Sequence, residues 1–373
     1  MNKAISLFLV LLAFAFLFVS CSNDGSVDEA FNCTITFNGN GATEGEMSVQ
    51  TAGIGVDARL NANTYERTKY LFTGWNTEQD GSGTAYEDGQ KIKITGNTTL
   101  YAQWEIIPII LDSSMKEWTD GNVYVLNSNV SIIGQIVVSG RVTLILNDGY
   151  TRIAIDGIRV DEGNSLTIEA SGEGTGRLEA TGHTGNAGIG GDLHRSCGTI
   201  TINGGTVNAR SETSGAGIGG GQDGSGTVTI NGGTVTATSY DGAAIGGGSG
   251  GNGTVTINSG TVTATSTHGA AIGGGSGGNG TVTINDGTVI ASINGGGGAG
   301  IGGGIHGSGG TITINGGTVT ASADLGGAGI GGGNGGSDGT LTLGEGVVLE
   351  VSLNNSDWSD YNGTTRRRYM RTK

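Results

Sequence analysis

The chain has 373 residues, of which 78 are glycine and one is proline, and only 5% are aromatic. Its 33 acidic residues outnumber its 18 basic residues, which gives a formal net charge of −15. This balance argues against a nucleic-acid partner, and against an anionic polysaccharide unless calcium bridges the two. The three cysteines, Cys21, Cys33 and Cys197, are too few for a disulfide scaffold, and the last two lie in different predicted domains.

The first twenty residues are typical of an export signal. Lys3 supplies the charged region, and an apolar run follows it over residues 4–19. The run ends in the sequence FVSC at residues 18–21, which resembles the bacterial lipoprotein box. The resemblance implies that Cys21 carries a lipid that holds the protein to a membrane, with residues 21–32 as a polar tether. An ordinary cleaved or anchored signal is the alternative.

Residues 33–105 differ in composition, with more aromatic side chains, more lysine and no long glycine runs. Three motifs follow one another: YLFTGWN at residues 70–76, DGSGTAYEDG at 80–89 and TTLYAQW at 98–104. Together they resemble the Listeria–Bacteroides repeat, also called the internalin B-repeat, although that family usually has glycine where this chain has Lys69. The resemblance implies a small β-grasp-like module of bacterial surface proteins, which serves as a spacer or adhesion element and not as an enzyme.

The aromatic residues of this segment favour a core over a ligand platform, because a domain of about 70 residues needs its large side chains inside. The residues expected in this core are Tyr70, Phe72, Trp75, Tyr101 and Trp104.

Between residues 198 and 343 one phrase recurs: Gly-Thr, then alternating apolar residues and threonines, then an Asn-Gly corner. The corner asparagine recurs at spacings of 28, 27, 27 and 30 residues, and the isoleucine of a second phrase, A-[GA]-I-G-G, recurs every 27 to 29 residues. A period of this length is typical of stacked, solenoid architectures. The corner asparagines are Asn203, Asn231, Asn258, Asn285 and Asn315.

Each repeat predicts one coil of a right-handed parallel β-helix with about 27–30 residues per coil. In residues 226–253 the alternation gives short strands with apolar side chains inward and threonines outward. The inward residues are Val228, Ile230, Val235, Ala237 and Ile245. We expect the corner asparagines to stack as a ladder, and the glycine-rich stretch 246–253 to be a poorly packed loop. A β-sandwich or a β-hairpin array is the alternative, because Asn-Gly between alternating runs also favours hairpins.

The stretch before the repeats continues the pattern less regularly, which indicates atypical coils that cap the solenoid. We therefore predict the β-helix for residues 106–355, with roughly nine coils. Residues 356–373 form a basic tail, with four arginines, that is suited to anionic lipid or cell-wall polymer.

The repeats offer little to catalysis, since residues 198–340 contain no lysine and only one arginine, Arg210. A hydrolase needs paired carboxylates at a set distance, and a β-helix lyase needs a basic proton acceptor. The irregular coils are the one place for a hidden site, with Asp148, Arg152, Asp156, Arg159, Asp161 and Glu162. The sequence therefore predicts no catalytic residue, no metal ligand and no cofactor.

Three further features have a structural and a functional interpretation. The histidines, His183, His194, His268 and His306, share no metal spacing and are expected to be solvated. The glycine loops around Asp223 and Asp338 are expected to be flexible turns, since a calcium site needs several converging oxygens. The Thr-x-Thr rows resemble ice-binding surfaces, but threonine is also well suited to any wet strand face. These rows are Thr227/Thr229, Thr254/Thr256, Thr281/Thr283 and Thr311/Thr313.

Taken together, these features predict a lipid-anchored, exported protein of the bacterial cell envelope. Its predicted role is structural or adhesive, through the repetitive β-helix, towards a polysaccharide or a host surface. Carbohydrate binding is the second prediction, and cleavage of a polysaccharide is the third.

Overall fold

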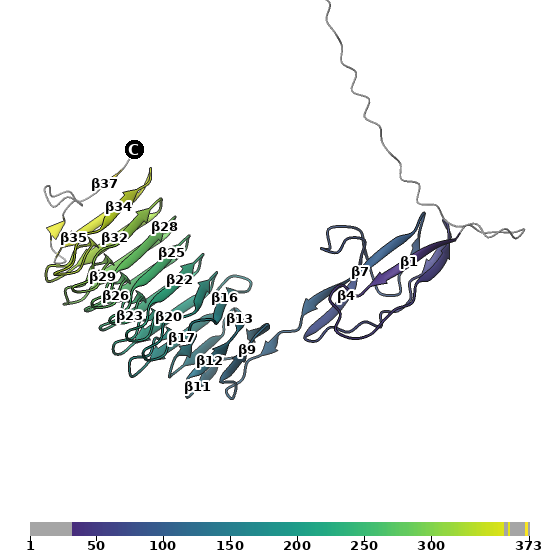
Figure 1. Ribbon diagram of the computed structural model, residues 1–373, viewed down its shortest axis with the longest axis horizontal. Coiled ribbons are helices and arrows are strands. Elements are labelled where there is room, and N and C mark those ends of the chain that lie inside the picture. Colours follow the sequence, from purple (N-terminus) through teal and green to yellow (C-terminus); the bar gives the residue numbers. More distant parts are fainter. Residues whose placement is uncertain (1–31, 354–356, 359–369, 372–373) are drawn as a thin grey trace, which may run out of the picture. The chain divides into compact units, whose positions relative to one another are not determined.

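The structure is a computed structural model that describes residues 32–353, 357–358 and 370–371. It divides into two compact units, one that ends at Ile107 and one that begins at Pro108. The described residues contain β-strands and no helix (Figure 1), so the predicted all-β class is confirmed. The predicted signal peptide, Cys21, nearly all of the tether and most of the basic tail lie outside the described residues.

The first unit is built on a five-stranded mixed sheet in the order β2-β1-β7-β4-β5. The central pair, β1 and β7, is parallel, and the other neighbours are antiparallel. A two-stranded antiparallel sheet, β3 with β6, accompanies it. The strands are β1 (Asn32–Asn38), β2 (Gln50–Gly53), β3 (Asp57–Arg59), β4 (Tyr70–Asn76), β5 (Ala85–Tyr86), β6 (Lys91–Lys93) and β7 (Thr98–Ile106).

The aromatic residues of this unit meet around Trp75, which is fully buried. Phe72 lies 5.0 Å from Trp75 and 5.6 Å from Trp104, ring centroid to ring centroid. The expected core is confirmed for Trp75, which is enclosed, and for Phe72 and Trp104, which are partly buried and pack against it. Tyr70 and Tyr101 are partly buried and do not belong to this cluster. The face of Tyr70 is covered by the guanidinium of Arg67, 3.9 Å from the ring centroid. One layer of strands is too thin to enclose every large side chain.

Lys69, at the position where the resemblance predicts glycine, has φ of 70°. That value lies in the left-handed region, which glycine adopts without steric cost and other residues rarely adopt. The local turn is therefore kept despite the substitution, at the cost of backbone strain.

The described residues from Pro108 onward form a parallel β-solenoid with three sheets. The first sheet contains β8 (Ile109–Ile110), β10 (Asn122–Leu126), β13 (Arg141–Leu146), β16 (Ser165–Ala170), β19 (Thr199–Ile202), β22 (Gly226–Ile230), β25 (Gly253–Ile257), β28 (Gly280–Ile284), β31 (Thr311–Ile314) and β34 (Thr340–Leu343). The second contains β11 (Val130–Ile132), β14 (Thr151–Ala154), β17 (Arg177–Gly182), β20 (Thr206–Ser211), β23 (Thr234–Ser239), β26 (Thr261–Ser266), β29 (Thr288–Ile293), β32 (Thr318–Ala323) and β35 (Val348–Leu353), with β36 (Asp357–Trp358) and β37 (Met370–Arg371) pairing antiparallel to β35. The third contains β9 (Glu117–Thr119), β12 (Ile136–Ser139), β15 (Ile158–Arg159), β18 (Ile189–Gly190), β21 (Ile218–Gly219), β24 (Ile245–Gly246), β27 (Ile272–Gly273), β30 (Ile301–Gly302) and β33 (Ile330–Gly331).

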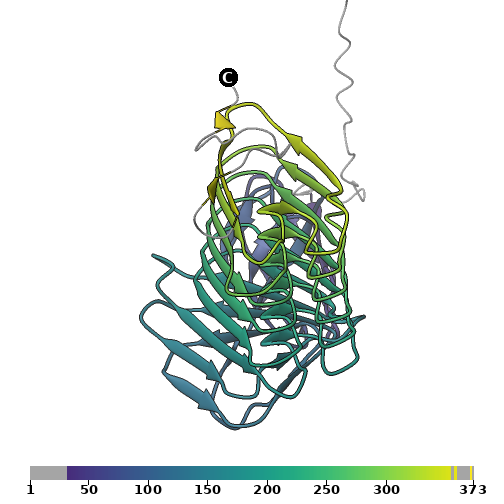
Figure 2. The ribbon, with the colours of Figure 1, turned by 90° about the vertical axis from the view of Figure 1, so that its left-hand side faces the viewer.

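Each coil supplies one strand to each sheet, and the described residues contain eight complete coils, from β10–β12 to β31–β33. Partial coils lie at either end, so the count is close to the nine predicted. Strands of neighbouring coils lie side by side in Figure 1, and the turned view of Figure 2 shows the coils one behind another. Equivalent residues of the repeats pair in parallel register, for example Val228 with Val255. This parallel pairing of successive coils excludes the alternative of a β-sandwich or hairpin array.

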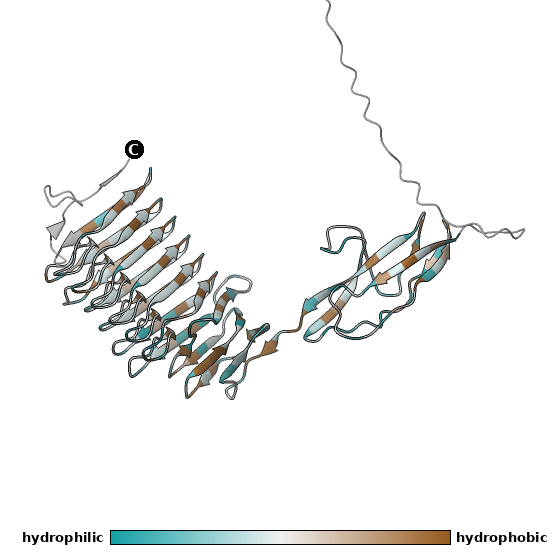
Figure 3. Ribbon diagram, viewed as in Figure 1, coloured by the Kyte–Doolittle hydropathy of each residue, from teal (hydrophilic) through white to brown (hydrophobic). Residues whose placement is uncertain are grey.

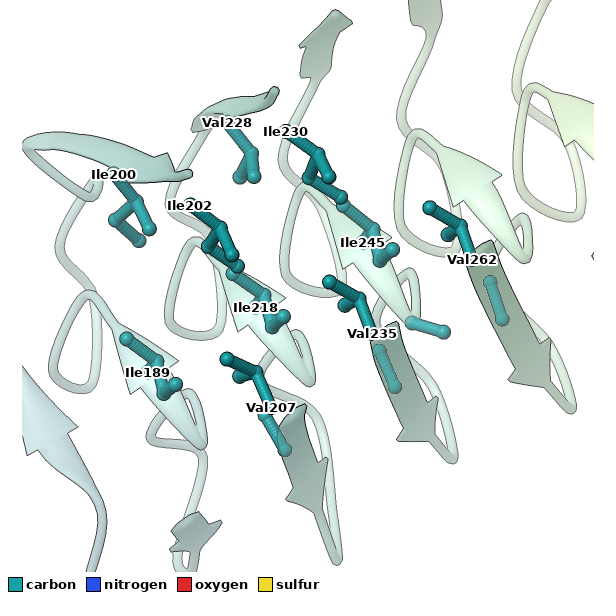
Figure 4. Close-up of a cluster of buried hydrophobic side chains, with 14 of the residues drawn as sticks. Ile189, Ile200, Ile202, Val207, Ile218, Val228, Ile230, Val235, Ile245 and Val262 are labelled. Carbon is teal, nitrogen blue, oxygen red and sulfur yellow. The ribbon is translucent and has the colours of Figure 1, made fainter. Parts of the chain in front are cut away.

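The interior of the solenoid is a stack of identical or similar aliphatic side chains. All five residues predicted to point inward in the coil of β22–β24 are at most 1% exposed. Figure 4 shows how Ile202, Ile230 and Ile245 line the interior together with their counterparts in neighbouring coils. The apolar bands recur at matching places on successive strands in Figure 3. Burial of this continuous column supplies the hydrophobic stabilisation that a single coil lacks.

The glycine-rich stretch 246–253 is closely packed, which corrects the expectation of a loose loop. Gly248 N–H donates to Gly224 O in the preceding coil at 3.0 Å, and Gly247 N–H donates to Gly273 O in the next coil at 2.9 Å. Gly246, Gly247 and Gly248 are buried. Because these residues have no Cβ, their main chains stack directly and satisfy one another's hydrogen bonds.

Candidate functional surfaces

The corner asparagines form a row at the end of the first sheet, joined by side-chain hydrogen bonds. In each bond the Nδ2 of one asparagine donates to the Oδ1 of its counterpart in the preceding coil. The distances are 2.7 Å for Asn231 to Asn203, 2.6 Å for Asn258 to Asn231, 2.6 Å for Asn285 to Asn258 and 2.7 Å for Asn315 to Asn285. The row begins at Glu169, whose Oε1 accepts from Asn203 Nδ2 at 2.5 Å. All five amides are half-buried or exposed, so water competes for these bonds.

Two further rows of polar side chains connect the coils, and the sequence analysis did not single them out. Asn252 Oδ1 accepts from the N–H of Asn279 at 2.8 Å, one coil later. At the end of β23, the buried Ser239 donates through Oγ to Gly215 O at 2.7 Å. Both positions recur with the period of the repeat, and that recurrence is the signal that would have revealed them.

The outward faces of the first and second sheets carry aligned threonines. In the first sheet the predicted Thr-x-Thr pairs are in register from coil to coil. The second sheet has a wider array, three residues across in β23 and β26, which the sequence analysis did not describe. These residues are Thr234, Thr236, Thr238, Thr261, Thr263 and Thr265.

Three of the four histidines pair with a carboxylate one coil away, which the expectation of solvated loop residues missed. His183 Nδ1 lies 2.9 Å from Glu212 Oε2, and His194 Nδ1 lies 2.7 Å from Asp223 Oδ2. His268 Nδ1 lies 2.9 Å from Asp241 Oδ1. The residues of each pair are 29, 29 and 27 positions apart, which is one repeat. No group of three or more metal-ligating side chains occurs among the described residues.

The charged residues of the irregular coils lie in separate contacts and do not form one site. Asp148 accepts from the main-chain N–H groups of Glu173 and Thr175, both at 2.7 Å, and these bonds lower the pKa of its carboxyl group. Asp156 accepts from the N–H of Gly134 at 2.7 Å. Arg159 binds Asp161 at 2.6 Å and Asp192 at 3.3 Å. Glu162 lines a different hollow, beside Cys197.

Arg152, also from this group, points into the solenoid interior and is fully buried. Its Nη1 donates to Asp112 O at 3.3 Å, while its Nε and Nη2 have no hydrogen-bond partner among the described residues. The guanidinium lies 5.8 Å from the centroid of the Trp118 ring. Burial lowers the pKa of Arg152 to about 10.

Cys197 is a free, buried thiol, so it is not joined to Cys33. Its Sγ accepts from the N–H of Thr227 at 3.1 Å, and burial raises the pKa of the thiol to about 11. The thiol is therefore protonated and unreactive at neutral pH.

A groove of about 640 Å³ lies on the outward face of the second sheet, over β17, β20 and β23. Arg177 Nε donates to Glu179 Oε1 at 2.7 Å within β17. On the neighbouring strand, Arg210 Nε donates to Thr181 Oγ1 at 3.2 Å, and Arg210 Nη2 binds Glu212. The outward side chains that line the groove are Arg177, Glu179, Thr181, Thr206, Asn208, Arg210, Thr234, Thr236 and Thr238.

Of the charged residues that line the groove, only Arg210 was singled out from the sequence. Thr206 pairs with Arg177, and Arg210 pairs with Thr181, so the two arginines lie on adjacent strands at opposite ends of the groove. Arg177 belongs to the irregular coils, whose register against the first regular repeat is not evident from the sequence.

Parts of the chain match two known protein families. Residues 34–103 match the Listeria-Bacteroides repeat domain. The β-helix repeat matches residues 200–222, 228–249, 255–276, 282–305 and 312–334. The chain carries a Listeria-Bacteroides repeat domain followed by β-helix repeats. The resemblance to the Listeria–Bacteroides repeat and the β-helix predicted from the period are therefore confirmed for these segments.

Two proteins of Evansella cellulosilytica are similar to short parts of the chain. One, named "Putative Gly-rich membrane protein", is 42% identical over 76 residues, which are 19% of this chain and 9% of that protein. The other, named "Putative membrane protein", is 36% identical over 77 residues, which are 20% of this chain and 11% of that protein. The chain thus spans about a tenth of the length of these curated relatives.

No solved structure matches the chain. None of the described residues forms a helix with the length and hydropathy needed to span a membrane.

Proposed function

We propose that this chain is a lipid-anchored surface protein of the bacterial cell envelope, with a structural or adhesive role rather than a catalytic one. The observation that carries the proposal is the repetition of the outward faces, where the same short hydroxyl side chains stand in register over successive coils. Such a face suits a long partner that makes many weak, similar contacts. The names of the two relatives, "Putative Gly-rich membrane protein" and "Putative membrane protein", support an envelope location.

The anchor is tested by the Cys21→Ser variant of the full chain, expressed in a bacterium and followed by detergent phase partitioning. If Cys21 carries the lipid, the variant moves to the aqueous phase while the wild type stays with the detergent. Cys197→Ser is the matched control, since Cys197 is a buried thiol of the solenoid. A Cys21→Ser variant that still enters the detergent phase contradicts the anchor.

A second candidate function is carbohydrate binding, and the groove over β17, β20 and β23 favours it. This hollow is lined by hydrogen-bonding side chains, while the neighbouring face carries only short hydroxyls. A glycan array, probed with and without calcium, tests binding. Release of reducing sugars from the bound glycans would show cleavage and contradict a non-catalytic role.

A further inference from the structure

The groove on the second sheet differs from the rest of that sheet in its side chains. In β23 and β26 all three outward positions of each strand are threonine. At four of the six matching positions of β17 and β20 the chain has Arg177, Glu179, Asn208 and Arg210 instead, and only the other two are threonine. Since β23 and β26 form the same sheet with threonine alone, the coil geometry does not require these long side chains. They are therefore available for a role other than holding the coils together.

The charges in the groove are already paired and held in place. Arg177 is fixed by Glu179, and Arg210 is fixed by Glu212 and Thr181. In the amide orientation that satisfies both partners, Asn208 accepts from Arg177 Nε at 3.3 Å and from Nη2 at 2.5 Å. A guanidinium has five N–H donors, so each arginine keeps donors that these bonds do not use. Carboxylate, amide and hydroxyl oxygens next to them supply acceptors.

These features define the ligand by its chemistry. The side chains that line the groove include no aromatic group and no apolar side chain larger than alanine, so an apolar ligand gains little there. An anion gains little as well, because both guanidinium groups are neutralised by carboxylates and the chain as a whole has a net charge of −15. A ligand with many hydroxyl groups and no charge matches a surface where donors and acceptors alternate.

We propose that the groove over β17, β20 and β23 binds an uncharged segment of a polysaccharide, with Arg177, Asn208 and Arg210 as its principal hydrogen-bonding residues. The inference rests on the second function proposed above, carbohydrate binding. The threonines of β23 continue the groove toward the repetitive face, so a long sugar chain would extend over the following coils from this point.

The test is a solution binding measurement on the full chain by isothermal titration calorimetry. The probes are uncharged cello-, xylo- and mannohexaose, with a hexamer of galacturonic acid as the anionic comparison. The key variant, Arg177→Thr/Asn208→Thr/Arg210→Thr, gives these three positions the residue that β23 and β26 already have there, so the solenoid is expected to stay folded. Binding of the uncharged hexamer should weaken by at least about tenfold, since that factor corresponds to loss of one hydrogen bond to a charged group.

Arg141→Thr is the matched control, because Arg141 is an exposed, outward arginine of the first sheet and lies outside the groove. It should bind the sugar as the wild type does. Equal binding by the triple variant overturns the groove while leaving carbohydrate binding in place. If the folded wild type binds none of the uncharged hexamers, or binds the galacturonic acid hexamer more tightly, the proposed ligand is wrong. Neither result bears on the membrane anchor, which the Cys21→Ser variant tests separately.

Discussion

Asn258 lies in the middle of the asparagine row and makes two side-chain hydrogen bonds, one to Asn231 and one from Asn285. Asn258→Ala removes both and leaves the two neighbouring amides to water. Because the row is at the surface, we expect a loss of only about 1 kcal/mol in the free energy of unfolding, the low end for two bonds. Chemical denaturation measures this loss. Ser259→Ala, at the next and exposed position, is the control, and equal stability of the two variants would show that the row does not stabilise the stack.

Gly246 and Gly277 separate two reasons for glycine in this chain. Both have positive φ, 135° and 80°, but a Cβ at Gly246 would overlap the carbonyl oxygen of Gly273 in the next coil, whereas a Cβ at Gly277 would meet no atom within 4 Å. Gly277→Ala should therefore cost only the backbone strain, about 1–2 kcal/mol. Gly246→Ala should cost more than about 4 kcal/mol or prevent folding, since coils must separate. Thermal unfolding of both variants checks this, and similar midpoints would contradict the close stacking of the glycine loops.

Strand β14 contains a residue that local pattern alone would not place inside a core. Arg152 occupies an inward position, in register with Val130 and Leu178, and two of its nitrogens lack a hydrogen-bond partner among the described residues. Its lowered pKa means that folding disfavours the charged form, so at neutral pH the buried guanidinium costs stability.

Replacement of Arg152 by methionine, which is long, flexible and uncharged, should be neutral or stabilising by up to about 4 kcal/mol. The comparison is Arg152→Lys, which keeps a buried charge and offers fewer donors, and it should destabilise the solenoid. The stability of the two variants is compared with that of the wild type from the denaturant concentration at the midpoint of unfolding. A large loss of stability in Arg152→Met would mean that the attraction of Asp112 and the hydrogen bond to its carbonyl outweigh the cost of burying the guanidinium.

The whole solenoid is a stack of interchangeable units, and this allows a test by deletion. Gly226, Gly253 and Gly280 pair in register on successive coils. Removal of residues 253–279 therefore joins Asn252 to Gly280 and places Asn285 next to Asn231 in the asparagine row. Since each coil contacts only its neighbours, the shorter chain should fold, with β-rich circular dichroism and a cooperative transition near that of the wild type. Deletion of residues 253–272, which is less than one period, should abolish the transition. Unfolding of the first variant would contradict the interchangeability of the coils.

Much of this protein was readable from its sequence, because its fold repeats. The solenoid, the inward positions such as Val228 and Ile230, and the parallel stacking follow from a period of 27 to 30 residues, since an interaction that recurs in every coil leaves a periodic trace. The resemblance of residues 34–103 was equally readable, because three motifs occur in order.

The tertiary structure alone decided what depends on contacts without such a trace. The close packing of the glycine loops is made by main-chain atoms, which have no side-chain pattern to read. The meeting of Arg177 with Asn208 and Arg210 depends on the register between an irregular coil and the first regular one. The number of residues per coil varies in this part of the chain. The strand pairing is therefore needed to show which side chains lie next to one another. The groove therefore depends on how neighbouring coils stack, whereas the structure of a single coil follows from the repeated sequence.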